Sequence, residues 1–277
     1  MRDIPYLTYQ FPDSINLYPI FDVHYGSAAH CEAEFRQYLD LILEDQVGYC
    51  VLGGDLVNNN VPGAPGLPHE DLVSPMMQKR DMVDLLRPLA KDGRILASVR
   101  GNHEFRSMKN SYQDVAADIM SKLDLENRYK GDRAILQIQI GTRLHGKNRA
   151  TPGVTYYVLL THGSGGGKKP GSTLNNADDL IKGYGGLDVS FSGHTHKPMM
   201  EFAAQTVLNH SGYHDKSCLV CVASSWMSME EQGYPVRKGL SPVDTCQVQK
   251  VTLHPPRKLD GGPDIEFNSF HLRGGRL

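Results

Sequence analysis

The amino-acid sequence predicts an α/β fold, and three observations support that class. In the first hundred residues, short apolar runs alternate with segments whose apolar residues recur at helical spacing, as in parallel strands joined by helices. Acidic, amide or histidine side chains follow these apolar runs, and such sheets bind ligands at the carboxyl ends of their strands. Beyond residue 199 only short strand candidates remain between glycine and proline residues, which predicts a second, mostly antiparallel sheet.

Three strands are predicted in the first half from short apolar runs that lead into polar motifs. The second and third runs give way at once to glycine-containing turns. A loop is predicted over residues 58–70, where three asparagines are followed by three prolines. The strands are expected at 16–22, 49–52 and 95–99.

Two helices are predicted between these strands. Apolar residues recur at helical spacing from Cys31 to Glu44. Ser74 is a candidate N-cap, and proline follows it at the first helical position. This second helix is expected to run to about residue 90 and to end at Gly93.

The second half has weaker signals. We find no internal repeat, low-complexity tract or linker, so one domain over residues 1–277 is predicted, with a motif core at about 16–200 and a mostly β part at about 200–277. Alternating apolar and polar residues over 134–140 predict a half-exposed strand. The other predictions are strands at 154–160, 189–191, 206–208, 218–223, 248–253 and 265–270, and helices at 112–123 and 178–182.

Bulk composition excludes several classes of protein. The net charge is −2, so there is no global basic bias of the kind that marks many nucleic-acid-binding proteins. Five cysteines at scattered spacings favour free thiols in a reducing compartment, and Cys218 and Cys221 would face opposite sides of a strand rather than form half of a zinc site. There is no apolar leader near the start and no apolar run of membrane-spanning length. We therefore expect a soluble cytoplasmic protein with no membrane partner.

The most informative feature is a series of five short motifs, in the order Asp-x-His, Gly-Asp, Gly-Asn-His-Glu, Thr-His-Gly and Gly-His-Thr-His. Each motif alone is compatible with an ordinary turn. Their joint occurrence, with four of the five closely following an apolar run, favours a metal site. The side chains that they supply are Asp22, His24, Asp55, Asn102, His103, His162, His194 and His196.

These side chains suit a pair of divalent cations. Neutral imidazole binds manganese, iron, zinc or nickel, and carboxylates bridge two cations and offset their charge. We expect manganese, with iron, zinc or nickel as alternatives. Asp55 is the natural bridge, because it follows what we take to be a central strand. Two bound cations lower the pKa of a water between them and activate it against a phosphate ester, and His103 is placed to protonate the leaving oxygen.

The motif series resembles the calcineurin-like metallophosphoesterases, whose pattern is D-x-H, G-D, G-N-H-[ED], H and G-H-x-H. The resemblance covers roughly residues 16–200. It implies a four-layer α/β sandwich, in which two mixed sheets are flanked by helices and the dinuclear metal site lies at the strand carboxyl ends. It also implies that His103 is the catalytic acid. The implied ligands are Asp22, His24, Asp55 and His196 for the first metal, and Asp55, Asn102, His162 and His194 for the second.

Departures from the family pattern narrow the reaction. Asn58 stands where many members carry Asp or Glu, and the arginine continuation of the Ser/Thr protein phosphatases is missing. The Asp22-x-His24-x-Gly26 spacing resembles the nuclease and phage-type members more closely. We therefore expect a phosphodiesterase acting on nucleic acid or a nucleotide. The alternatives are a phosphomonoesterase or protein phosphatase, and a non-catalytic scaffold, although scaffold members typically lose the histidine that this chain keeps as His103.

Residues outside the motifs suggest where a phosphate ester would bind. Arg106 follows the Gly-Asn-His turn, where it could bind a phosphate oxygen or form a surface salt bridge. Lys168 and Lys169 end a glycine-rich loop after His162, which is either a phosphate-binding loop or an ordinary surface loop. A basic loop over 140–153 could line a groove for a polyanion. The sequence leaves the substrate, the native metal, the oligomeric state and any protein partner open.

Overall fold

The computed structural model describes residues 5–66, 71–141, 153–165, 170–209, 212–228, 244–256 and 263–272. These residues form two mixed sheets, called here sheet A and sheet B. Sheet A has the strand order β1 (Tyr6–Phe11), β5 (Arg133–Ile140), β6 (Val154–Thr161), β7 (Val189–Ser192), β9 (Gly212–Val222) and β8 (Met199–Asn209). Sheet B has the order β11 (Asp264–His271), β10 (Gln247–His254), β2 (Ile15–Ile20), β3 (Gly48–Leu52) and β4 (Ile95–Ser98).

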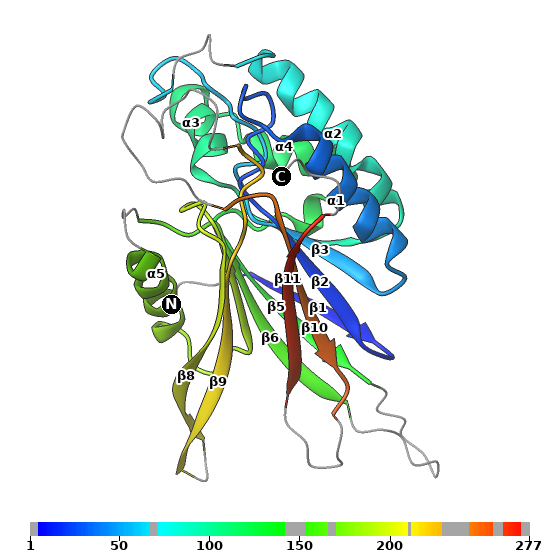
Figure 1. Cartoon of the computed structure of the whole chain (residues 1–277), viewed down its shortest axis with the longest axis vertical. Helices are drawn as coiled ribbons and strands as arrows, with labels where there is room; N and C mark the ends of the chain where they lie inside the picture. Colours follow the sequence, from blue (N-terminus) through cyan, green and yellow to red (C-terminus); the bar gives the residue numbers. More distant parts are fainter. Residues whose placement is uncertain are drawn as a thin grey trace.

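The helices cover the outer faces of the two sheets (Figure 1). One side of the sandwich carries most of them, and α5 lies on the other side, against β9 and β8. The expected α/β sandwich of two mixed sheets flanked by helices is thereby confirmed. The helices are α1 (Glu32–Glu44), α2 (Pro75–Lys91), α3 (Asn102–Ser111), α4 (Val115–Lys122) and α5 (Pro170–Lys182), with a 3₁₀ turn η2 (Glu126–Arg128).

Three apolar cores hold these layers together. The core between the two sheets contains Leu17 and Phe191, both fully buried. A second core, with Phe35 and Leu86, joins sheet B to α1, α2 and α4, and a third, with Ile181, joins sheet A to α5. Each fully buried side chain of this size stabilises the fold by about 1.5–3 kcal/mol. The two sheets are thus packed face to face in one relative position, which determines how their strand ends meet.

The strands after residue 199 do not form a sheet of their own, so that expectation was wrong. β9 pairs in parallel with β7, and β8 pairs with β9 at the edge of sheet A. β10 pairs antiparallel with β2 in sheet B. The physical reason is burial: Leu219 in β9 and Val251 and Leu253 in β10 are fully buried in the core between the sheets. The division of the chain into domains stays a prediction.

Local signals set the bounds of the first two helices. α1 begins one residue after the predicted start, and the Ser74 side chain accepts a hydrogen bond from the Met77 N–H at the start of α2. Gly93 follows α2 with φ +71°, a conformation that suits glycine after a helix. Cys221 lies in the core between the sheets and Cys218 in the core under α5, so the two thiols face opposite sides as expected.

Other elements differ from expectation. β1 was not predicted, and α3 begins inside the Gly-Asn-His-Glu motif, where we expected only a turn. The helix expected at 112–123 starts at Val115 because Tyr112 is left-handed, with φ 59°, and Asp114 caps the new helix. α5 begins at Pro170 rather than at 178, with Thr173 and Ala177 already buried on its inner face.

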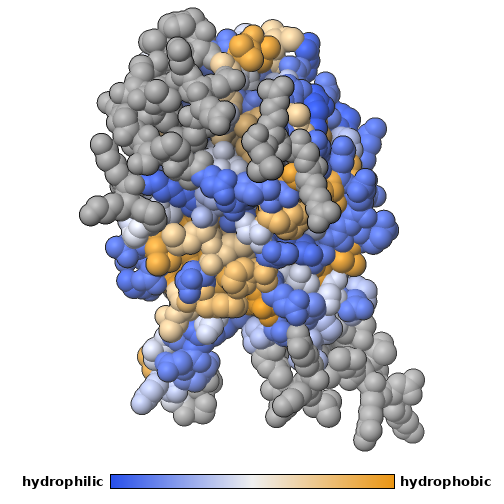
Figure 2. Space-filling model, viewed as in Figure 1, coloured by the Kyte–Doolittle hydropathy of each residue, from blue (hydrophilic) through white to orange (hydrophobic). Residues whose placement is uncertain are grey.

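Both sheets present an edge strand on the face shown in Figure 2, where apolar surface is visible. Phe202 of β8 and Phe267 of β11 are 44% and 41% exposed, and their rings meet edge to face at 5.6 Å between centroids. This contact links the two edge strands. None of the described helices is long and apolar enough to cross a membrane.

Candidate metal centre

The structure brings the eight motif side chains together from the carboxyl ends of five strands. Sheet B supplies Asp22 and His24 after β2, Asp55 after β3, and Asn102 and His103 after β4, at the start of α3. Sheet A supplies the remaining three. His162 follows β6, and His194 and His196 follow β7.

Five of these residues have a left-handed backbone. Asp22, His24 and Asp55 have φ between 47° and 51°, and His194 and His196 have φ of 70° and 58°. Such values are uncommon outside glycine and cost on the order of 1–3 kcal/mol each, so they persist only where the surroundings enforce them. Here the His24 N–H donates to the Asp55 carbonyl at 2.9 Å, and the two loops after β2 and β3 run side by side. The strained backbones turn the side chains toward one another.

Two glycines allow the loops to approach this closely. Gly54 has φ +90°, and a Cβ there would lie 2.2 Å from the Gly101 nitrogen. A Cβ on Gly193 would lie 2.5 Å from Oδ2 of Asp22. No side chain fits either gap without moving the backbone or the carboxylate, which explains the glycine that precedes Asp55 and the one that precedes His194.

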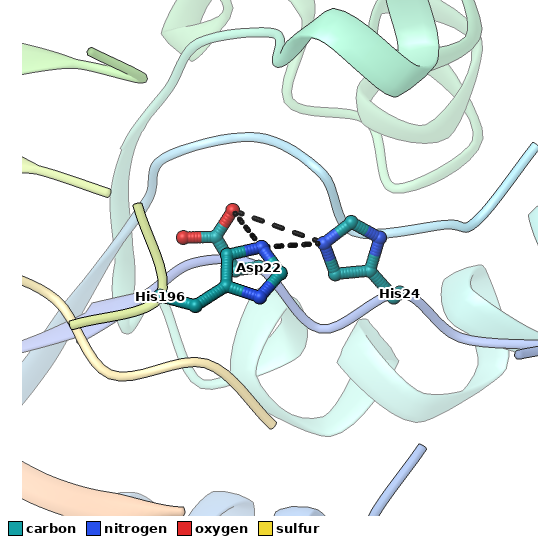
Figure 3. A group of neighbouring side chains, drawn as sticks. All are labelled: Asp22, His24 and His196. Carbon is teal, nitrogen blue, oxygen red and sulfur yellow. Dashed lines mark hydrogen bonds and ion pairs between the residues drawn. The ribbon is translucent and has the colours of Figure 1, made fainter. Parts of the chain in front are cut away.

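The first group of candidate ligands is Asp22, His24 and His196, whose side chains point toward one another (Figure 3). The Nε2 atoms of His24 and His196 are 3.1 Å apart. The Asp22 Oδ1 atom lies 3.9 Å from the first of these nitrogens and 3.5 Å from the second. Two imidazole nitrogens and one carboxylate oxygen therefore face a common point.

The second group is Asp55, His162 and His194, with Asn102 beside it. His162 Nε2 lies 3.3 Å from Asp55 Oδ2 and 3.1 Å from Asn102 Oδ1. His194 Nδ1 lies 2.8 Å from the same Asn102 oxygen. The other ring nitrogen of His162, Nδ1, meets the Gly53 carbonyl at 2.9 Å, which aims Nε2 into the group.

A third group, His24, Asp55 and His103, connects the other two. The Nε2 atoms of both histidines lie 3.8 Å from Asp55 Oδ2, so this carboxylate is shared among the groups. His103 Nδ1 is 2.5 Å from the Asn58 carbonyl oxygen. Its Nε2 is 2.8 Å from a guanidinium nitrogen of Arg106, so the ring nitrogen that faces the centre contacts a cationic donor.

Charge and burial shift the pKa values of these groups in opposite directions. Burial raises the pKa of Asp22 to about 7 and lowers that of His196 to about 4. Burial also lowers the pKa of His24 well below its usual value, with His103 adding to the effect. For His162, burial favours the neutral ring, but Asp55 outweighs it and raises the pKa to about 10. The rings of the first group are thus neutral near pH 7, whereas His162 is charged.

Glu104 supports the centre without facing it, and we did not assign it a role from the sequence. Its carboxylate is fully buried and accepts hydrogen bonds from the backbone N–H groups of Gly101, Asp55 and Leu56 at 2.9, 2.9 and 2.7 Å. It thereby ties the loop after β4 to the loop after β3. Burial and the neighbouring Asp55 raise its pKa to about 7. The only sequence signal was its place in the Gly-Asn-His-Glu motif.

The predicted substrate-binding residues are only partly described. The Arg106 side chain contacts the Asn58 carbonyl and the Asn60 side chain, each at 3.2 Å, besides His103. Within the described ranges it has no carboxylate at salt-bridge distance. Lys168 and Lys169 lie outside the described residues, as does 142–152 of the basic loop.

The donor set fits divalent cations. Asp22 Oδ1 is buried without a hydrogen-bond partner in the described part of the chain, although a buried carboxylate oxygen normally has one. It faces two neutral imidazole nitrogens. A cation held there would satisfy the oxygen and both nitrogen lone pairs, and the mixture of imidazole, carboxylate and amide ligands suits manganese, iron, zinc or nickel.

One protein-family model covers the candidate metal centre. The family model described as calcineurin-like phosphoesterase matches residues 22–198, which is more than half of the chain and includes all eight motif side chains. No curated protein matches the sequence. One similar solved structure is Vps29 from Chaetomium thermophilum, with 10% identity, a TM-score of 0.36, and coverage of 92% of this chain and 95% of that one. The same protein complexed with the RaPID-derived cyclic peptide RT-D3 is also similar, with 11% identity, a TM-score of 0.25, and coverage of 93% and 96%.

Proposed function

This chain belongs to the calcineurin-like phosphoesterase family, and we propose that it is a two-metal phosphoesterase that hydrolyses phosphodiesters, with nucleic acid or a nucleotide as substrate. One observation carries the proposal. Ligand atoms from two separate sheets converge in overlapping groups, and Asp55 belongs to two of the three. A carboxylate shared between two sets of imidazoles can bridge a pair of cations of the kind found in two-metal hydrolytic sites.

The proposed ligands follow the two groups. Asp22, His24, Asp55 and His196 would hold the first cation, and Asp55, Asn102, His162 and His194 would hold the second. Bound there, the cations would supply Lewis acidity that makes a water nucleophilic near neutral pH and offsets the charge of the phosphate. Manganese is the proposed native metal.

The proposed general acid is His103, on the first turn of α3. Its Nδ1–H donates to the Asn58 carbonyl, which leaves Nε2 to face the centre. Without substrate, burial lowers the pKa of His103 and the Arg106 guanidinium adds to that effect. A phosphate in the site would draw the Arg106 N–H groups to its own oxygens. Nε2 would then be free to take a proton and deliver it to the leaving oxygen.

The preference for diesters rests on sequence features at the centre. The chain keeps the Asp22-x-His24-x-Gly26 spacing and lacks the arginine that continues the second motif in protein phosphatases. Asn102 is exposed and the His196 side chain is 21% exposed, so the centre is open to solvent on one side. An open centre accepts a substrate with groups on both sides of the phosphorus. None of the five cysteines, all of which lie in described ranges, forms a disulfide, and this suits a cytoplasmic enzyme.

The test compares hydrolysis of a bis-aryl phosphodiester and the matching aryl monoester by manganese-loaded protein. The same protein with His103→Ala is the control for contaminating phosphatases. We expect faster turnover of the diester, and this result would justify assays with DNA, RNA and cyclic nucleotides. A preference for the monoester would support the phosphatase alternative instead. Turnover of neither ester by protein with bound metal would contradict the proposal and favour a scaffold.

A further inference from the structure

A carboxylate outside the motifs organises the loop that contacts both His24 and His103. Asp71 accepts hydrogen bonds from Asn58 Nδ2 at 2.6 Å, from Asn60 Nδ2 at 2.8 Å and from Gln78 Nε2 at 2.7 Å. A fourth contact comes from the Asn60 backbone N–H at 3.3 Å. Asp71 lies between the loop after β3 and the start of α2, and no sequence motif marks it.

The neighbouring backbone holds Asp71 in place. Asp71 forms an isolated β-bridge with Ser27, and the next residue, Leu72, donates its N–H to the Gly26 carbonyl at 2.7 Å. Gln78 is fully buried, and its side-chain oxygen accepts from the Asn59 N–H at 2.8 Å. The carboxylate is therefore fixed relative to the segment that carries His24.

The hydrogen bonds allow only one orientation of the Asn58 side chain. A carboxylate can only accept, so the amide nitrogen of Asn58 must face Asp71. The amide oxygen then faces His24 Nδ1 at 3.2 Å. This oxygen can only accept, so Nδ1 must carry the proton, and the lone pair of His24 lies on Nε2. Nε2 is the nitrogen that faces Asp22 and His196.

We infer that Asp71 is a positioning residue that fixes the tautomer of His24 through the Asn58 amide and so prepares the first group of ligands for a cation. The cation part of this inference rests on the proposed function. The tautomer part concerns the protein without metal. The Asn58 amide contacts His24, and the negative charge of Asp71 lies one hydrogen bond farther from that histidine.

Asn58 also links the two functional histidines. Its side chain contacts His24, and its carbonyl oxygen contacts His103 Nδ1. Because Asp71 fixes the side chain of Asn58, we expect substitution of Asp71 to disturb His24 directly. The effect on His103 should be smaller, since that contact uses the Asn58 backbone.

The first experiment is ¹⁵N-histidine NMR of the metal-free protein, in which protonated and unprotonated ring nitrogens have well-separated shifts. We expect His24 of the wild type to carry its proton on Nδ1, and Asp71→Asn to give a mixture of tautomers. Manganese titration should show affinity for the first cation falling by about 10–100-fold, as for loss of a group that orients a ligating histidine. Affinity for the second cation should be unchanged. Asp118→Asn is the matched control, because Asp118 pairs with Lys79 on the outer helices.

A charge swap keeps the test decisive if Asp71→Asn destabilises the fold. Asn58→Asp alone places two carboxylates against each other. Among these variants, it should lower the affinity for the first cation most. Asn58→Asp combined with Asp71→Asn restores one donor and one acceptor across the same contact, and we expect the double variant to recover the Nδ1 proton on His24. The inference is overturned if Asp71→Asn leaves tautomer and affinities as in wild type, or if the swap recovers neither. Failure of the wild type to hydrolyse any ester would count against the proposed function but would leave the tautomer result intact.

Discussion

The two sheets contribute unequal halves of the candidate metal centre. On the sheet B side, groups outside the centre support the ligands: Glu104 binds the loop of Asp55, and Asn58 binds His24. On the sheet A side, the support comes largely from the opposite half. The His162 ring is held by the Gly53 carbonyl, and the His194 N–H donates to Asp22 Oδ2 at 2.8 Å.

This difference follows from topology. β2, β3 and β4 are parallel neighbours, so their three carboxyl ends lie side by side and the loops can bind one another. In sheet A only β6 and β7 contribute parallel ends, and their loops share the hydrogen bond from the Gly193 N–H to the His162 carbonyl at 2.9 Å. The His162 ring and the His194 N–H bind groups of the sheet B side instead. We therefore expect the sheet B half to keep its geometry without metal, whereas the sheet A half depends on contacts across the sandwich.

The largest effect is expected from a substitution that disrupts both halves of the candidate metal centre at once. Asp55→Asn removes the carboxylate shared between the groups, so both cations should be lost and turnover should fall by more than the ~10–100-fold typical of residues that only orient ligands. Asp22→Asn should remove one cation and leave the other. Metal content of the purified variants by mass spectrometry decides between these outcomes. Equal metal content in Asp55→Asn and wild type would contradict the bridging role.

The next effect separates chemistry from metal binding. His103→Ala should leave both cations bound and lower turnover by about 10²–10⁴-fold, because an imidazole that protonates the leaving group is lost. His271→Ala, at an exposed histidine paired with Asp244, is the control and should be neutral. Loss of metal along with activity in His103→Ala would identify His103 as a ligand, since it lies in the same group as His24 and Asp55.

A smaller effect is expected from breaking the support of the sheet B half alone. Glu104→Ala leaves the buried N–H groups of Gly101, Asp55 and Leu56 without their acceptor. Each such group costs about 1–3 kcal/mol, so urea denaturation should show a loss of at least that size. Glu32→Ala, on the exposed start of α1, should change stability by less than about 0.5 kcal/mol. Equal stability of the two variants would show that Glu104 does not hold the loops together.

The smallest expected effect is a difference between the two halves in the number of protons released when each cation binds. Near pH 8, the pKa values leave Asp22 ionised and His24 and His196 neutral, whereas His162 still carries its proton. Uptake of the second cation should therefore release about one proton, and uptake of the first should release almost none. Calorimetry in two buffers of different ionisation enthalpy measures this. Asp22→Asn, which we expect to bind only the second cation, should still release the proton, and its absence there would refute the assignment.

The same shift sets a stability trend for the metal-free protein. The folded-state pKa of His162 is raised from 6.5 to about 10, so its charged form stabilises the fold fully below pH 6.5. This contribution is lost as the pH rises through 10. Affinity for the second cation should change in the opposite sense, because the cation requires the neutral ring. Thermal denaturation with and without manganese across this range would show the two trends.

Much of the fold was readable because its signals are local. The N-cap at Ser74, the glycine after α2 and the apolar spacing of α1 each involve residues within a few positions of one another. The motif series was also readable, since each ligand lies directly beyond a strand in sequence. We predicted a turn and not α3, because the helix begins within the motif itself. There the Asp55 carboxylate accepts from the His103 N–H, and the Glu104 carboxylate accepts from the Gly101 N–H.

The sequence by itself predicted which side chains gather in the candidate metal centre and near which strand ends they lie. Only the tertiary structure decided how the late strands divide between the sheets. A late strand buries its apolar side chains in the core between the sheets whichever of the two sheets it joins. It also decided the roles of Glu104, Asn58 and Asp71. Their hydrogen bonds join segments up to 49 residues apart, such as that between Glu104 and the Asp55 N–H. No local pattern encodes such a bond, because it exists only once neighbouring strands of sheet B have brought their carboxyl ends together.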